Sequence, residues 1–152
     1  MAATPDSVKK LLNLGFDVAI EAGAGAEASL PDAEYVAAGA TVVEDTRALW
    51  AQADLVLKVQ PPEQHEALGV HEADLLPMGA IIVCFVQADL HPDVTERLAA
   101  RKATVLAVEQ VPRISRAQKM DVLSSQANVA GYRAVIEAAA SFGSFFTGQF
   151  TA

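Results

Sequence analysis

The chain has 152 residues, of which 52% are hydrophobic and 20% are charged, and its formal net charge is −8. This length and composition predict one folded domain with a buried core and exclude a disordered chain. The negative charge argues against a surface that binds nucleic acid or anionic lipid, and the longest apolar run, 80–86, is far shorter than the ~20 residues of a membrane-spanning helix.

The first half of the chain is expected to alternate helices with short apolar strands. Thr4 is a good N-cap, Pro5 suits the first helical position, and the helix is predicted to end at Asn13. Further helices are expected to begin at Pro31-Asp32 and after Asp45, which can act as a cap. Short apolar runs between these helices predict strands at 16–20, 40–43 and 55–59.

The second half continues this alternation. Pro61-Pro62 breaks the chain after the third strand, and 63–77 is predicted to form one or two short helices with a break at Gly69. A helix over 91–101 is expected between two further strands, at 81–86 and 103–108. Because the strands are almost continuously apolar, we expect a parallel sheet that helices cover on both faces.

The two ends of the chain depart from the alternation. Residues 117–142 predict one long helix with Gly131 as its weakest point, and 145–149 resemble a linker, which indicates a fragment. The chain opens with a helix where an α/β fold normally opens with a strand. The first strand is therefore expected to be missing, which leaves unpaired backbone groups in the sheet that another chain could fill.

A glycine-rich turn, Gly23–Ala28, follows the first predicted strand. It matches the loose pattern of dinucleotide-binding loops, and Glu44 lies at the spacing of a ribose-binding acid. In such sites the glycines open the helix whose N-terminus faces the pyrophosphate, whereas here 29–32 intervene before a helix can begin. We interpret the segment as an ordinary turn.

No metal site is predicted. His65, His71 and His91 lack ligand spacing to one another and to Cys84, and their polar neighbours are typical of surface loops. Cys84 lies among apolar residues, which indicates a buried, unreactive thiol.

Lys58 lies inside an apolar strand, near the carboxyl end where open α/β sheets bind ligands. A buried lysine is costly unless it is paired or used in a site. Two interpretations stay open: Lys58 is a substrate-side residue, or it reaches solvent from the strand end.

The densest polar segment is 113–128. On a helix, steps of three and four residues would align Gln118, Asp121, Ser125 and Asn128, with Ser124 beside them. With the planar donors of Arg113, these groups could satisfy every hydrogen bond of a neutral carboxamide. The alternative is a solvated helix face, which would carry more Lys and Glu.

The same segment carries a family resemblance. The matching motifs are Pro112–Gln118, Met120-Asp121, Leu123–Gln126 and Ala130–Ala134, supported by Thr4–Val8, Leu14–Phe16, Glu21–Gly25 and Val56–Gln60. In these motifs the chain resembles the alpha subunit of proton-translocating NAD(P) transhydrogenase over essentially its whole length.

The resemblance implies a three-layer α/β fold of the Rossmann or flavodoxin kind. Residues 1–152 would form one domain, similar to the first subdomain of the NAD(H)-binding component, without the dinucleotide-binding subdomain that follows the long helix in the family. By position, Arg113, Gln118, Asp121 and Ser124 match the residues at the nicotinamide carboxamide, and no catalytic residue is implied. The chain alone is expected to bind NAD(H) weakly or not at all and to be inactive.

The resemblance also implies a setting for the chain. The family transfers hydride from NADH to NADP and couples this to proton translocation, so the expected partners are a second copy of the chain, an NADP-binding component and a membrane proton channel. The chain would be cytoplasmic and peripheral to the inner membrane.

Two alternatives to this function stay open. The first is the N-terminal domain of an alanine dehydrogenase; Lys58 matches that family's keto-acid lysine, but Gln87 stands where its histidine is expected. The second is a non-catalytic oligomerisation module.

Overall fold

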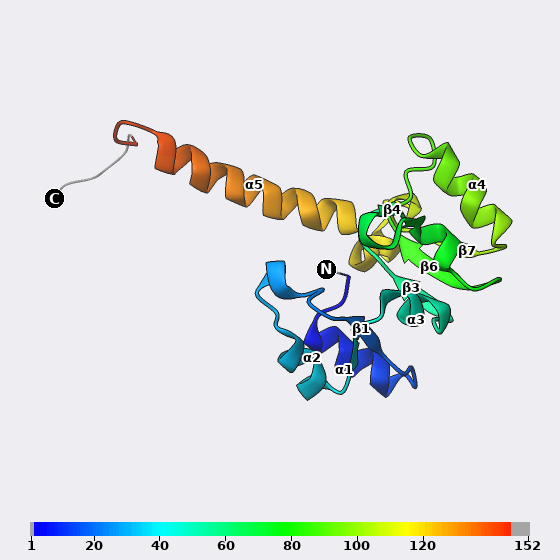
Figure 1. Cartoon of the computed structure of the whole chain (residues 1–152). Helices are drawn as coiled ribbons and strands as arrows, with labels where there is room; N and C mark the ends of the chain where they lie inside the picture. Colours follow the sequence, from blue (N-terminus) through cyan, green and yellow to red (C-terminus); the bar gives the residue numbers. More distant parts are fainter. Residues whose placement is uncertain (1, 147–152) are drawn as a thin grey trace. The chain divides into compact units, whose positions relative to one another are not determined.

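The computed structural model describes residues 2–146 (Figure 1). The chain divides into two compact units, Met1–Val108 and Glu109–Ala152, and the assignment of 1–152 to one domain stays a prediction. In chain order the first unit contains α1 (Pro5–Asn13), β1 (Ala19–Glu21), α2 (Asp32–Ala38), β2 (Thr41–Val43), α3 (Thr46–Ala51), β3 (Leu55–Leu57), β4 (Gln64–His65), β5 (Val70–His71), β6 (Ile81–Cys84), α4 (Pro92–Ala100) and β7 (Thr104–Ala107).

The predicted helix starts are confirmed where a side chain caps the helix. Thr4 and Ser7 form a reciprocal capping box at the start of α1, and Pro5 is its first residue. The carboxylate of Asp45 accepts a hydrogen bond from the backbone N–H of Ala48 at 3.1 Å, so α3 begins at Thr46. These caps satisfy backbone donors that the first turn of a helix leaves unpaired.

Five of the described strands pair in parallel, but in two sheets. β1 pairs with β2, and β6 lies between β3 and β7 in a three-stranded sheet. Within residues 2–146 no backbone pairing joins the two sheets, so the predicted single sheet is divided. Within the described sheets β1, β2, β3 and β7 each keep one unpaired edge. The missing first strand stays a prediction.

The larger core surrounds β6. Ile82 and Cys84 of this strand are fully buried and pack in one cluster with Trp50, Leu76 and Leu98. α4 supplies Leu98 and lies beside β6 and β7 (Figure 1). The predicted burial of the strands on both faces is wrong in the described sheet: Ile82 and Cys84 bury one face of β6, whereas Ile81 on its other face is exposed, and β3 and β7 also carry exposed side chains.

A smaller core lies under α1 and α2, which are neighbours beside β1 (Figure 1). Val8 and Tyr35 are fully buried there and pack with Ala38 and Ala40. The hydroxyl of Tyr35 donates a hydrogen bond to the carbonyl oxygen of Ala3 at 2.9 Å, which ties the start of the chain to α2.

The segment between β3 and β6 is only partly as predicted. It contains two 3-10 helices, Glu66–Leu68 and Glu72–Leu75, and Gly69 breaks the chain between them with a φ of +64°. β4 and β5 form an antiparallel pair that was not predicted. Strands of two residues are too short to show an alternating pattern.

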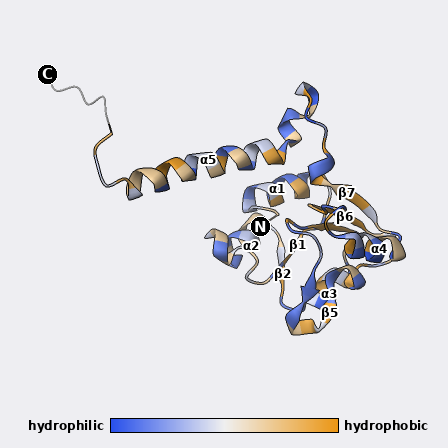
Figure 2. Ribbon diagram, turned by 90° about the horizontal axis from the view of Figure 1, so that it is seen from above, coloured by the Kyte–Doolittle hydropathy of each residue, from blue (hydrophilic) through white to orange (hydrophobic). Residues whose placement is uncertain are grey.

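The second unit contains a 3-10 helix over Ser115–Met120, followed by α5 (Val122–Ser141). The predicted start of the long helix at 117 is therefore wrong, because Asp121 caps the helix and separates it from the 3-10 turn. Hydrophobic and hydrophilic residues alternate along α5 (Figure 2). Among the described residues, no helix is both long and apolar enough to cross a membrane. The expected linker over 145–149 lies partly outside the described residues.

Candidate functional site

Asp121 and Ser124 are brought together in the first turn of α5. The backbone N–H of Ser124 donates to Oδ1 of Asp121 at 3.0 Å, and the Ser124 hydroxyl donates to Oδ2 at 2.5 Å. One serine thus engages both oxygens of the carboxylate. Each oxygen keeps a lone pair that can accept a further hydrogen bond from a ligand.

The other two predicted residues precede this turn. The two hydrogen bonds from Ser124 hold the pKa of Asp121 below its usual value, and the positive charge of Arg113 lowers this pKa further. Gln118 accepts a 3.3 Å hydrogen bond from the N–H of Asp121 through its backbone carbonyl. The side chains of Arg113 and Gln118 are exposed, and their convergence on one carboxamide stays a prediction.

The helical stripe that we predicted is wrong at Gln118. Residues 115–120 form a 3-10 helix rather than the first turns of α5, so Gln118 does not share a helix face with Asp121 and Asn128. The segment therefore offers the exposed guanidinium of Arg113, the exposed amide of Gln118 and the part-buried carboxylate of Asp121, which caps α5. This set can donate to an amide oxygen and accept from an amide N–H.

Acidification should weaken the cap that the Asp121 carboxylate forms at the start of α5. Because the pKa of Asp121 is lowered in the folded chain, its stabilising effect is present above the ordinary Asp value of about 3.9 and is lost as the pH falls through the lower folded value. Hydrogen exchange at the backbone N–H of Ser124 should accelerate below that range, after correction for intrinsic rates. Asp121→Asn should abolish this pH dependence. Unchanged protection of the wild-type amide down to pH about 2 would contradict the assignment.

Lys58 has a partner that sequence reasoning missed. Its ammonium lies 3.1 Å from Oε2 and 3.2 Å from Oε1 of Glu72, and their side chains are 21% and 11% exposed. The backbone N–H of Glu63 also donates to Glu72, at 2.9 Å. Lys58 therefore does not simply reach solvent from the strand end. Its ammonium forms a part-buried ion pair with the Glu72 carboxylate.

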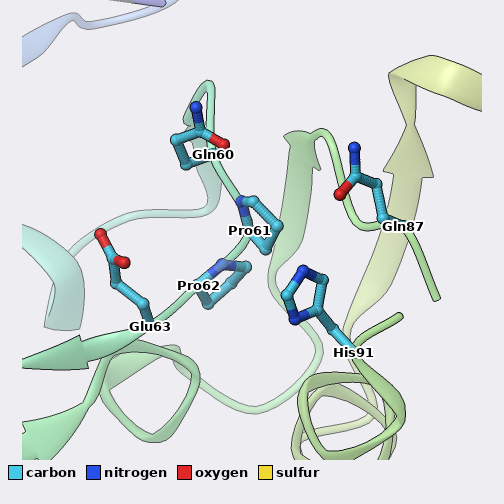
Figure 3. Close-up of a pocket in the computed structure, with 6 residues that line it drawn as sticks. All are labelled: Gln60, Pro61, Pro62, Glu63, Gln87 and His91. Carbon is cyan, nitrogen blue, oxygen red and sulfur yellow. The ribbon is translucent and has the colours of Figure 1, made fainter. Parts of the chain in front are cut away.

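A pocket of about 210 Å³ lies beyond the carboxyl ends of β3 and β6 (Figure 3). Its lining consists of Gln60, Pro61, Pro62, Glu63, Gln87 and His91. Gln87 follows β6 with a left-handed φ of +48°, which is uncommon for a residue other than glycine. Parallel sheets usually bind ligands at this end, but the pocket itself was not predicted from the sequence.

In the glycine-rich turn, the carboxylate of Asp32 binds the backbone N–H that a phosphate would need. Both carboxylate oxygens of Asp32 lie 3.0 Å from the backbone nitrogen of Gly23. A negatively charged side chain at the glycine N–H repels a pyrophosphate. The geometry supports our interpretation of this segment as an ordinary turn.

We expected all three histidines to lie in surface loops, but one of them is buried. His71 is only 8% exposed, and both His65 and His71 accept hydrogen bonds from backbone N–H groups through Nδ1. Within residues 2–146 no group of three or more His, Cys, Asp and Glu side chains could hold a metal ion. Cys84 is buried, as predicted.

Comparisons with known proteins identify the family of this chain. The family model "Alanine dehydrogenase/PNT, N-terminal domain" matches residues 1–130. The NAD(P) transhydrogenase subunit alpha of Haemophilus influenzae is 47% identical over all 152 residues, which make up 28% of that relative. The chain therefore spans less than a third of its length.

Solved structures agree with this match. The crystal structure of transhydrogenase from Sinorhizobium meliloti has a TM-score of 0.87 and 42% identity, and the match covers 99% of this chain and 43% of that one. An L-alanine dehydrogenase is more distant, with a TM-score of 0.64, 32% identity, and coverage of 72% and 28%. The Rossmann-like fold is thereby confirmed, and the chain belongs to the alanine dehydrogenase/PNT N-terminal domain family.

Proposed function

We propose that this chain is part of a pyridine nucleotide transhydrogenase, which transfers hydride from NADH to NADP and couples this to proton translocation. The supporting observation is the 47% identity with a transhydrogenase alpha subunit over all 152 residues, because the likeness to an alanine dehydrogenase is lower in identity, coverage and TM-score. Since the chain spans 28% of that relative, the activity would belong to a longer assembly.

Within that assembly the chain would orient the nicotinamide end of NAD(H). The guanidinium of Arg113 and the amide of Gln118 would donate to the carboxamide oxygen, and Asp121 would accept from the carboxamide N–H. Ser124 would hold the Asp121 carboxylate in place through its two hydrogen bonds. The bound nicotinamide supplies the hydride, and these side chains contribute by positioning it.

Lys58 would have a structural role in this account. Its ammonium is already matched by Glu72, and a substrate carboxylate would have to displace that partner. The ion pair therefore favours the transhydrogenase interpretation over an alanine dehydrogenase that holds a keto acid with this lysine.

NADH titration followed by nucleotide fluorescence tests the proposal. The chain alone should bind very weakly, because most contacts to the pyrophosphate and adenosine would come from outside residues 1–152. A chimera in which residues 1–152 replace the matching stretch of the Haemophilus influenzae alpha subunit should bind NADH as that subunit does. Micromolar binding by the isolated chain, or no binding by a folded chimera, would contradict the proposal.

The same assembly would include a second copy of the chain, an NADP-binding component and a membrane proton channel that holds it at the cytoplasmic side of the inner membrane. The exposed apolar side chains of α5 support association. Val129, Tyr132 and Ile136 follow one another at steps of three and four residues, and Tyr132 is 71% exposed.

A non-catalytic oligomerisation module is the second candidate function, and the unpaired edges of β1 and β3 favour it. Sedimentation equilibrium separates the two surfaces. Tyr132→Asp should shift a dimer towards monomer if α5 mediates association, whereas Ala134→Asp, which adds the same charge to an exposed position on another face of the helix, should not. Equal association of both variants and wild type would exclude α5 and favour edge pairing, and a strict monomer would exclude both.

A further inference from the structure

Two imidazoles hold the segment Gln64–Leu75, here called the clamp segment. Nδ1 of His65 accepts a hydrogen bond from the backbone N–H of Leu68 at 3.3 Å, and Nδ1 of His71 accepts one from Ala73 at 3.2 Å. Each imidazole therefore caps one of the segment's 3-10 helices. A protonated imidazole carries hydrogen on both nitrogens and can accept neither bond.

The clamp segment also contacts the chain that follows the carboxyl end of β3. Glu72 follows His71 directly and binds both the ammonium of Lys58, which follows β3, and the backbone N–H of Glu63, which lines the pocket. Loss of the cap at His71 would leave the N–H of Ala73 unpaired in a buried place. A buried donor without a partner favours opening of the segment to water.

Cations face the clamp segment from each element that packs against it. Arg47 of α3 donates to the carbonyl oxygen of Leu68 at 3.0 Å, and Arg97 of α4 forms a 2.7 Å ion pair with Asp74. Arg101, just after α4, donates to the carbonyl oxygen of Asp74. The other charged groups are Lys58 at β3 and, on or beside the segment, Glu63, Glu66 and Glu72. Because Glu72 and Asp74 are already matched, a new positive charge on His71 gains little from either.

We propose that the clamp segment is an acid-sensitive device: protonation of His65 and His71 removes the two caps, detaches Glu72 from Lys58 and Glu63, and opens the carboxyl end of β3. Because a protonated imidazole cannot accept either capping bond, acidification favours the open form.

Hydrogen exchange of three backbone N–H groups in the full chain reports each step. Protection at Leu68, Ala73 and Glu63, corrected for intrinsic rates, should fall about tenfold between pH 8 and pH 5.5, the scale expected for loss of a capping hydrogen bond. The amide of Ile82 in the buried strand β6 serves as an internal reference and should keep its protection.

Three substitutions distinguish the device from general acid destabilisation. In His71→Asn and His65→Asn an amide oxygen can accept the cap bond without titrating, so the pH dependence at Ala73 or Leu68 should disappear. His91→Asn is the matched control, because the His91 side chain caps no N–H of its helix, and it should retain the wild-type profile. Protection at Ala73 that is constant or rises on acidification in the wild type would overturn the proposal, even if the variants fail to fold.

Discussion

Replacing Ile82 with alanine should lower the free energy of unfolding by about 2–5 kcal/mol. Ile82 is fully buried in β6, the central strand of the three-stranded sheet, and packs in one cluster with Trp50, Leu76 and Leu98. Truncation removes apolar contacts and leaves a cavity that paired strands on both sides cannot close. Urea unfolding can be followed through the fluorescence of Trp50, the only tryptophan in the chain.

Ile81→Ala provides the matched control. Ile81 is the adjacent residue of the same strand, but its side chain is 38% exposed. Its truncation should cost about 1–2 kcal/mol, less than that of Ile82, because more than a third of the side chain already contacts water. Equal losses for the two variants would show that β6 is not buried as described.

Glu72→Ala should lower the free energy of unfolding by about 2–3 kcal/mol, less than the 3–5 kcal/mol typical of a fully buried ion pair, because both partners retain some contact with water. The substitution leaves the ammonium of Lys58 unpaired and removes the acceptor for the N–H of Glu63. The same urea titration measures the loss.

A double variant isolates the charge from the hydrogen bond. In Lys58→Met with Glu72→Gln, the glutamine oxygen can still accept from Glu63, and no unpaired charge remains. This variant should recover most of the stability that Glu72→Ala loses. A double variant as unstable as Glu72→Ala would contradict the assignment of that loss to an unpaired ammonium and a missing acceptor.

The sequence predicted those elements that depend only on neighbouring residues, such as a helix cap or a continuous apolar run. Thr4-Pro5 marked the start of α1, and the apolar run around Ile82 marked β6. The division into two sheets was not predictable in this way, because it depends on which strand edges meet. The partner of Lys58 was missed for the same reason, since Glu72 lies 14 residues away and is reached only through the β4–β5 turn.

The candidate site was predicted in part. A spacing of three residues placed Asp121 near Ser124, and the two do interact, although through a helix cap rather than along a helix face. No proline or glycine marks the boundary at 121, so helix preference alone extended α5 too far. Asp is more favourable at the N-cap of a helix than in its interior. The helix therefore begins after Asp121, and Gln118 lies outside it in the 3-10 helix.

The most direct test of the nicotinamide site compares two arginines in the Haemophilus influenzae chimera described above. Arg113→Ala should weaken NADH binding by about 10- to 100-fold, the range for loss of a hydrogen bond from a charged donor, and should slow hydride transfer to NADP. Arg116→Ala, also exposed and only three residues away, should leave both unchanged. Full binding and activity in Arg113→Ala, or equal losses in both variants, would contradict a nicotinamide contact from this segment.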